Sequence, residues 1–330
     1  MKKFVFYFLI SIFVFAACND TIESPYPTID FKQVNTEQGI GRASAVSFVI
    51  GENAYIGLGR NVSRNPALND LWEFNSNNNV WTKKGNFPGK ARVNAIAEVV
   101  NGMAFVGLGY DSDFGVYQDG GSQLKDFWSY NSITDSWMQK TSFPSDKTNA
   151  CISFVVGSDI YVGLGFNGWS FENEIWKYNT LNDTWLQLRN SPMASRAAAV
   201  SCSNGNKIFI GTGYNTNNLN DWWEYSPDSD SWKQCRSLPD GGRQLGVAIC
   251  VSDRFFVSTG RHFGGDVTDG FLFDDILEYD VSKDCWYRRG VLPGGGRENA
   301  IIFSINGTCY IGLGENDNGI LNDLWSFSVN

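Results

Sequence analysis

The chain has 330 residues, which is enough for two average domains or for one large all-β domain. Aromatic residues make up 15% of it, which excludes a disordered chain, and its 35 glycines do not recur at every third position as they do in collagen. The formal net charge of −9 makes nucleic acid a poor partner, and the single histidine excludes any site that needs two.

The N-terminus has the pattern of an export signal. Two lysines at positions 2 and 3 precede an almost unbroken apolar run over residues 4–15, which is too short to span a bilayer comfortably. Ala16 and Ala17 then precede Cys18, and this order resembles the lipobox of bacterial lipoproteins. We expect a lipoprotein signal peptide over residues 1–17 and lipidation of Cys18. The alternative is an ordinary secretory leader followed by an unrelated cysteine.

Residues 18–28 are mostly polar and contain Pro25 and Pro27, which predicts an extended tether. No later segment is long and apolar enough to cross a membrane. We expect a monomer in the bacterial cell envelope. It would be held to the outer membrane by its N-terminal lipid alone, on the periplasmic or the surface side.

One unit recurs six times between residue 29 and residue 330. An aromatic residue is followed seven positions later by tryptophan in five copies, which are Phe74/Trp81, Tyr130/Trp137, Tyr178/Trp185, Tyr225/Trp232 and Tyr279/Trp286. Four positions before each aromatic residue, and before Phe327 in the sixth copy, stands an acid: Asp70, Asp126, Glu174, Asp221, Asp275 and Asp323. An apolar run that ends in glycine precedes each acid, and these glycines are Gly59, Gly109, Gly165, Gly213, Gly260 and Gly314.

Each unit predicts four β-strands, here lettered a to d. Strand a is an alternating run such as residues 93–100, strand b ends at the glycine, strand c carries the Tyr or Phe, and strand d carries the Trp. Units of about 50 residues with four strands are typical of propeller blades. The sequence therefore predicts an all-β, six-bladed β-propeller over residues 29–330.

The Tyr-to-Trp spacing and the glycine at the end of strand b resemble kelch repeats over residues 29–330. Kelch repeats usually carry two glycines at this point, and this chain replaces the first of them by Leu58, Leu108, Leu164, Thr212, Thr259 and Leu313. The resemblance implies a galactose oxidase-like kelch propeller. It extends distantly to the N-acetylneuraminate epimerases and mutarotases, a kelch-propeller family that implies a cofactor-free sugar isomerase.

The sixth unit lacks a tryptophan strand because residue 330 follows its strand c directly. Phe31 occupies the tryptophan position when the constant spacing is counted back from the first glycine motif. We expect residues 28–34 to form strand d of the last blade, paired with a strand over residues 324–329. This closure would remove an exposed sheet edge between the first and last blades.

Several motifs suggest other chemistry. Residues 163–168 match a dinucleotide-binding glycine pattern, but no helix pattern follows. Residues 111–115 lack the glutamate that would close a calcium loop. His262 stands alone, so the two-histidine copper site of galactose oxidase is not carried over. We expect no metal and no cofactor, and we expect the six cysteines after Cys18 to be buried small residues.

The loops between strands b and c vary most in length, and such insertions commonly mark a binding face. Five arginines begin strand a on that face: Arg42, Arg92, Arg196, Arg243 and Arg297. Blade 3 has Thr148 at this position, next to Lys147. The arginines either bind a ligand, for which an acidic one fits best, or pair with the repeated acids. A second set follows the glycines directly: Arg60, Tyr110, Phe166, Tyr214, Arg261 and Glu315.

Trp169 is the one tryptophan outside the repeat pattern, and it lies in the third b–c loop. It either stacks on a ligand or folds back on its own blade. The expected function is that of a non-enzymatic module that binds a glycan or a protein partner through the b–c loop face. The alternative is a cofactor-free sugar epimerase or mutarotase, in which the arginines and Glu298 or Glu315 supply acid–base groups.

Overall fold

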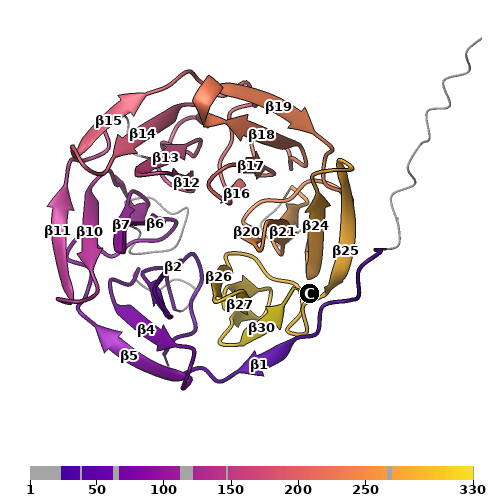
Figure 1. Ribbon diagram of the computed structural model, residues 1–330, viewed down its shortest axis with the longest axis horizontal. Helices are drawn as coiled ribbons and strands as arrows, with labels where there is room; N and C mark the ends of the chain where they lie inside the picture. Colours follow the sequence, from indigo (N-terminus) through magenta and orange to yellow (C-terminus); the bar gives the residue numbers. More distant parts are fainter. Residues whose placement is uncertain are drawn as a thin grey trace, which may run out of the picture.

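The computed structural model describes residues 24–37, 39–61, 67–111, 122–145, 148–265 and 270–329. The expected signal peptide, Cys18, Lys147 and most of the calcium-like motif lie outside the described residues. Within them, six four-stranded antiparallel sheets surround a central channel (Figure 1). The predicted six-bladed β-propeller is confirmed.

The blades are numbered 1 to 6 from the one that contains β2, and strands a to d run from the channel outwards (Figure 1). Strands a are β2 (Val46–Ile50), β6 (Ile96–Val100), β12 (Ile152–Val156), β16 (Val200–Ser203), β20 (Val247–Val251) and β26 (Ile301–Ile305). Strands b are β3 (Asn53–Gly57), β7 (Met103–Gly107), β13 (Asp159–Gly163), β17 (Ile208–Gly211), β21 (Arg254–Ser258) and β27 (Thr308–Gly312). Strands c are β4 (Leu71–Asn75), β10 (Phe127–Asn131), β14 (Ile175–Asn179), β18 (Trp222–Ser226), β24 (Asp275–Asp280) and β30 (Leu324–Ser328). Strands d are β5 (Val80–Lys84), β11 (Ser136–Lys140), β15 (Thr184–Gln187), β19 (Ser231–Cys235), β25 (Cys285–Val291) and β1 (Lys32–Val34).

Short hairpins extend three of the b–c loops. They are formed by β8 (Tyr110–Asp111) with β9 (Ser122–Gln123), β22 (Arg261–Phe263) with β23 (Gly270–Leu272), and β28 (Glu315–Asn316) with β29 (Gly319–Ile320). A single turn of 3₁₀ helix, η1 (Pro227–Ser229), lies between strands c and d of blade 4. No helix among the described residues has the length and apolar character needed to cross a membrane.

The blades pack through aromatic side chains at the spacing that the repeat predicts. Tyr130 and Trp137 lie opposite each other on strands c and d of blade 2, with ring centroids 4.7 Å apart. Phe48 and Tyr55 of blade 1 stack on each other at 5.2 Å and both contact Tyr130 edge-on. Each interface therefore buries rings from two blades, which gives a large apolar stabilisation per residue.

The glycine kept in all six copies has a conformational reason. Gly59 has a φ of +79°, and a Cβ atom there would lie 2.5 Å from the carbonyl oxygen of Ala43. Its N–H donates to the carbonyl of Arg92 in the next blade at 2.8 Å. Leu58, at the position of the first kelch glycine, also has a left-handed φ of +58°. Both positions of the family's glycine pair are thus left-handed, and only the second also lacks room for a side chain.

The N-terminal strand closes the propeller as predicted. β1 pairs with Leu324–Ser326 of β30, and Phe31 contacts Phe327 at 5.3 Å in place of the missing tryptophan. The strand is shorter than expected, because the residues before Phe31 lie along blade 5 instead. There Ile29 donates its N–H to the carbonyl of Arg289 at 2.8 Å, and the Arg289 guanidinium donates to the carbonyl of Pro27 at 2.9 Å.

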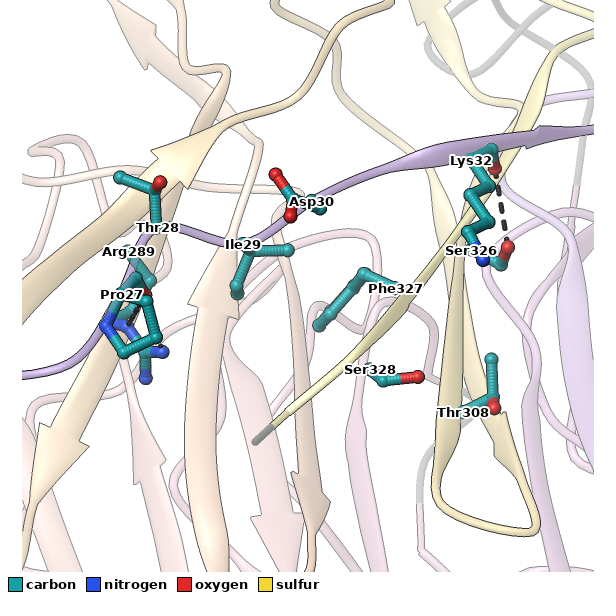
Figure 2. A pocket seen from close by; sticks show the side chains of 10 residues that line it. All are labelled: Pro27, Thr28, Ile29, Asp30, Lys32, Arg289, Thr308, Ser326, Phe327 and Ser328. Atoms are coloured by element: carbon teal, nitrogen blue, oxygen red, sulfur yellow. Dashed lines mark hydrogen bonds between the residues drawn. The ribbon is translucent and has the colours of Figure 1, made fainter.

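A pocket of about 600 Å³ opens where the N-terminal segment passes from blade 5 to β30 of blade 6 (Figure 2). Ile29 and Phe327 form its apolar part, and Lys32 and Ser326 meet at its edge (Figure 2). Tyr26, in the expected tether, packs on Tyr287 of blade 5 at 6.1 Å. The N-terminal segment therefore links blades 5 and 6 before it completes the ring.

Candidate functional site

The five repeat arginines are buried beneath the b–c loop face. Each is at most 1% exposed and forms two hydrogen bonds with the acid that begins strand c of the same blade. The pairs are Arg42–Asp70, Arg92–Asp126, Arg196–Asp221, Arg243–Asp275 and Arg297–Asp323. The structure thus forms the pairing that the sequence left as one alternative, and these guanidinium groups do not reach the surface.

Except in blade 5, which has Leu277 there, the same acid also accepts a hydrogen bond from the tryptophan two positions later. Asp70 accepts hydrogen bonds from Arg42 at 2.8 and 3.0 Å and from Trp72 Nε1 at 2.7 Å. Burial by itself would raise the pKa of Asp70, but the hydrogen bonds and charge of Arg42 outweigh it and lower the pKa. In blade 3, which has Thr148 in place of arginine, Glu174 accepts from Ser145 and Trp176 instead.

The second set of predicted residues forms a ring at the channel mouth, here called the mouth ring. Each member forms an isolated β-bridge with the residue that directly follows the repeat arginine, or Thr148 in blade 3. All six members therefore lie at the same level of the channel. The bridges are Ala43–Arg60, Val93–Tyr110, Asn149–Phe166, Ala197–Tyr214, Gln244–Arg261 and Glu298–Glu315. Blades 2 to 4 contribute aromatic side chains, whereas blades 5, 6 and 1 contribute charged ones.

A closed cycle of main-chain hydrogen bonds fixes this mouth. In each blade the residue after this β-bridge partner has a left-handed φ between +52° and +56°. Its N–H donates to the carbonyl of the equivalent residue in a neighbouring blade, at 2.9 to 3.3 Å. The six residues are Ser44, Asn94, Ala150, Ala198, Leu245 and Asn299. The sequence analysis missed them, although they stand at a constant position two residues after each repeat arginine or Thr148. The cycle makes the mouth a preformed structure.

Charged side chains gather on one side of the mouth. This charged cluster consists of Arg60, Arg261, Glu298, Glu315 and Asp317. Arg261 donates to Glu298 at 2.8 Å and to Asp317 at 2.7 Å, while Arg60 pairs with Glu315. The structure thus brings together four predicted residues from three blades and adds Asp317, which no repeat pattern marks.

The charged cluster keeps hydrogen-bonding capacity. Arg60 Nε and Arg261 Nη1 are buried and have no partner among the described residues. Burial raises the pKa of Glu298; the charge of Arg261 opposes this shift and that of Glu315 adds to it. The cluster therefore combines two guanidinium groups that each keep one unpaired N–H with a carboxyl group that is easier to protonate than usual.

A row of rings occupies the other side of the mouth. This aromatic row runs from Phe166 to Phe171, Tyr214 and Phe263, with successive centroids 5.3, 6.1 and 5.6 Å apart. All four are half-buried, so part of each ring reaches solvent. Phe171 and Phe263 were not predicted, because they lie in loops outside the repeat. Tyr110 does not join the row, since it is buried against Ala67 and Val93.

Trp169 stands beside the aromatic row and is 95% exposed. Its loop is held by Asn167, whose side-chain oxygen accepts the N–H groups of Trp169 and Ser170 at 2.8 and 2.9 Å. Of the two interpretations from the sequence, the structure has the one in which the indole does not fold back on its blade. An ordered loop that presents a bare indole is typical of a contact residue.

His262 lies at the edge of this face and is not a freely exposed residue. It is half-buried, stacks on Phe271 at 5.0 Å and hydrogen-bonds through Nδ1 with the carbonyl of Gly242 at 2.8 Å. Among the described residues, no group of three or more His, Cys, Asp or Glu side chains is placed to hold a metal ion. The cysteines of the described part are free thiols: Cys151, Cys202, Cys235, Cys250, Cys285 and Cys309.

The blade count, the repeat and the buried arginine–acid pairs define a β-propeller of the kelch class. Residues 44–260 match the family model of the KLHDC2/KLHL20/DRC7 Kelch-repeats domain, and the chain belongs to the kelch family. The fold is similar to that in a solved structure entitled "Structure of YjhT", with a TM-score of 0.73 and 18% identity over 92% of this chain and 96% of that one. No curated protein matches the chain.

Proposed function

We propose that this protein is a non-enzymatic module that binds a glycan through its b–c loop face. The observation that carries the proposal is the division of the mouth ring into an aromatic half and a charged half. Sugars present an apolar C–H face, which stacks on aromatic rings, and an edge of hydroxyl groups, which hydrogen-bonds with charged side chains. The aromatic row, Trp169 and the charged cluster offer both kinds of contact on one rigid rim.

The charges favour a neutral glycan over the acidic ligand expected from the arginines. The repeat arginines are buried in ion pairs, and the charged cluster holds three carboxyl groups against two guanidinium groups. The chain as a whole also has a net charge of −9. An anionic sugar would be repelled, whereas the hydroxyl groups of a neutral sugar can donate to the Asp317 carboxylate, whose side chain is 68% exposed.

The test is a glycan array with the purified protein, followed by affinity measurements on the sugars that bind. Trp169→Ala should weaken binding at least about tenfold, which is about 1.4 kcal/mol, and leave the melting temperature unchanged. Leu181→Ala is the control, because Leu181 is 75% exposed in a turn on the opposite face. Binding of a protein partner alone, or equal losses for both variants, would contradict the glycan proposal.

The second candidate is a cofactor-free sugar epimerase or mutarotase. It is favoured by Glu298, which has a raised pKa and lies in one cluster with Glu315 and two arginines. Anomer exchange requires only a group that donates a proton and a group that accepts one. Exchange measured by NMR should then be accelerated by the protein and fall sharply in Glu298→Gln. Binding without any acceleration would leave the binding module as the function.

We further propose that the protein is a lipoprotein anchored through Cys18 in the bacterial cell envelope. β1 runs antiparallel to β30, so the N-terminal segment joins the propeller from the face of the a–b and c–d turns. An anchor there would leave the b–c loop face directed away from the membrane. Cys18→Ala should move the protein from the detergent phase to the aqueous phase. Unchanged partitioning would contradict lipidation.

A further inference from the structure

A cavity lies inside the channel, away from the mouth ring. Its volume is about 580 Å³, within the range of small-molecule pockets, and its walls come from all six inner strands. Gly157 and Gly205, in the turns between strands a and b, border it. The cavity therefore opens toward the face opposite the b–c loops. Because strands form its walls, its shape is preformed.

Three serine hydroxyl groups of this wall already donate their hydrogens within the protein. Ser47 donates to the carbonyl of Ile302 at 3.2 Å, and Ser201 donates to the carbonyl of Ser153 at 2.8 Å. Ser153 in turn donates to the Glu98 carboxyl group at 2.7 Å. Each hydroxyl oxygen keeps lone pairs but has no hydrogen left for a ligand. These three serine side chains can therefore accept a hydrogen bond from a ligand but have none to donate.

Glu98 is the one charged residue among the described residues that line the cavity. At the same position of strand a, three other blades carry phenylalanine stacked on a tyrosine: Phe48 on Tyr55, Phe154 on Tyr161 and Phe303 on Tyr310. Blade 2 has Phe105 at the tyrosine position, opposite Glu98. Glu98 thus puts a carboxyl group where three other blades place a ring, and it keeps part of its surface exposed.

We propose that this cavity is a second ligand site, which binds a small organic ammonium ion with its charged end at Glu98. An ammonium group brings only hydrogen-bond donors, which suits the three serine oxygens and the Glu98 carboxyl group, and its charge is compensated by the one carboxylate present among the described lining residues. The apolar remainder of the ligand would lie against Val49, Val99 and Val155. This site does not depend on glycan binding, which the opposite face would perform.

The test uses the full protein and two probes of similar size. 2-Aminoethanol is an ammonium ion at about pH 8, whereas ethylene glycol is neutral and has the same number of heavy atoms. NMR titration should show saturable shifts at residues of the channel wall with the ammonium ion in the millimolar range, and none with the diol. Glu98→Gln should weaken the binding at least tenfold while the fold is retained.

Two further variants separate this site from others. Glu98→Phe restores the residue type of three other blades, so it should fold well and lose ammonium binding completely. Trp169→Ala, on the opposite face, should leave ammonium binding unchanged even if it abolishes glycan binding. Equal affinities for both probes, undiminished binding in Glu98→Gln, or no saturable shift in the wild-type protein would each overturn the proposal.

Discussion

Arg243 Nη1 lies 2.6 Å from Asp275 Oδ1, and both side chains are fully buried. The guanidinium group also packs over the ring of Phe273, with its carbon 3.6 Å from the ring centroid. Similar pairs recur in blades 1, 2, 4 and 6. An ion pair of this kind fixes the orientation of its two side chains inside the blade. Removal of one partner leaves an unpaired charge in a medium that solvates it poorly.

Arg243→Ala should therefore lower the free energy of unfolding by about 3–5 kcal/mol, because it leaves Asp275 buried and unpaired. Urea denaturation followed by tryptophan fluorescence measures this change. Arg189→Ala is the control, since Arg189 is 87% exposed and its ion pair lies at 3.9 Å, and it should change stability by less than about 1 kcal/mol. Similar losses in both variants would contradict the role assigned to the buried pair.

Gly109→Ala should be far more damaging than Gly102→Ala. Both glycines have a left-handed φ, +93° and +75°, so each substitution costs about 1 kcal/mol of backbone strain. A Cβ atom on Gly109 would also lie 2.6 Å from the carbonyl oxygen of Val93, whereas one on Gly102 meets nothing within 4 Å. We expect Gly109→Ala to lose at least about 2 kcal/mol more in chemical denaturation. Equal losses would show that the tight contact has room to relax.

Phe31→Ala should destabilise the whole propeller, because Phe31 fills the tryptophan position of blade 6 against Phe327. The side chain is half-buried, so we expect a loss of about 2–3 kcal/mol in a single unfolding transition. Lys32→Ala, at the next and exposed position, is the control. If Phe31→Ala melts like the control, closure by the N-terminal strand does not stabilise the ring.

Glu98→Gln should change how stability depends on pH. Burial raises the pKa of Glu98 to about 7, while its hydrogen bond from Ser153 opposes the shift. The folded state therefore binds this proton more tightly than the unfolded state, so the stability it contributes is present below about pH 4.5 and is lost as the pH rises toward 7.

The amide that Glu98→Gln introduces cannot titrate, so the difference in unfolding free energy between the wild type and this variant isolates the carboxyl group. Relative to the variant, the wild-type protein should lose about 1–3 kcal/mol between about pH 4.5 and pH 8. Melting curves of both proteins over this range provide the measurement. A difference that stays constant with pH would mean that the carboxyl group has its ordinary pKa.

The repeat made much of the fold predictable. Tyr130 and Trp137 face each other across two strands, and that contact depends only on a hairpin of constant length. The same holds for the glycine at Gly59, which has no room for a Cβ atom. Phe31 could be assigned to the last blade because the constant spacing between a strand-d tryptophan and the next glycine motif also holds between Phe31 and the first glycine motif.

The number of blades, their strands and the manner of closure could be predicted from the repeat, because contacts between neighbouring strands follow from local spacing. The pairing of the charged groups depends instead on how the blades come together. Arg243 and Arg261 are both buried near the channel mouth, but Arg243 pairs with Asp275 of its own blade, whereas Arg261 reaches Glu298 and Asp317 of the next blade. Glu98 likewise looks like any polar residue of an alternating strand until the neighbouring blade places Ser153 against it. Such contacts join segments whose separation along the chain varies with loop length, so no fixed spacing encodes them.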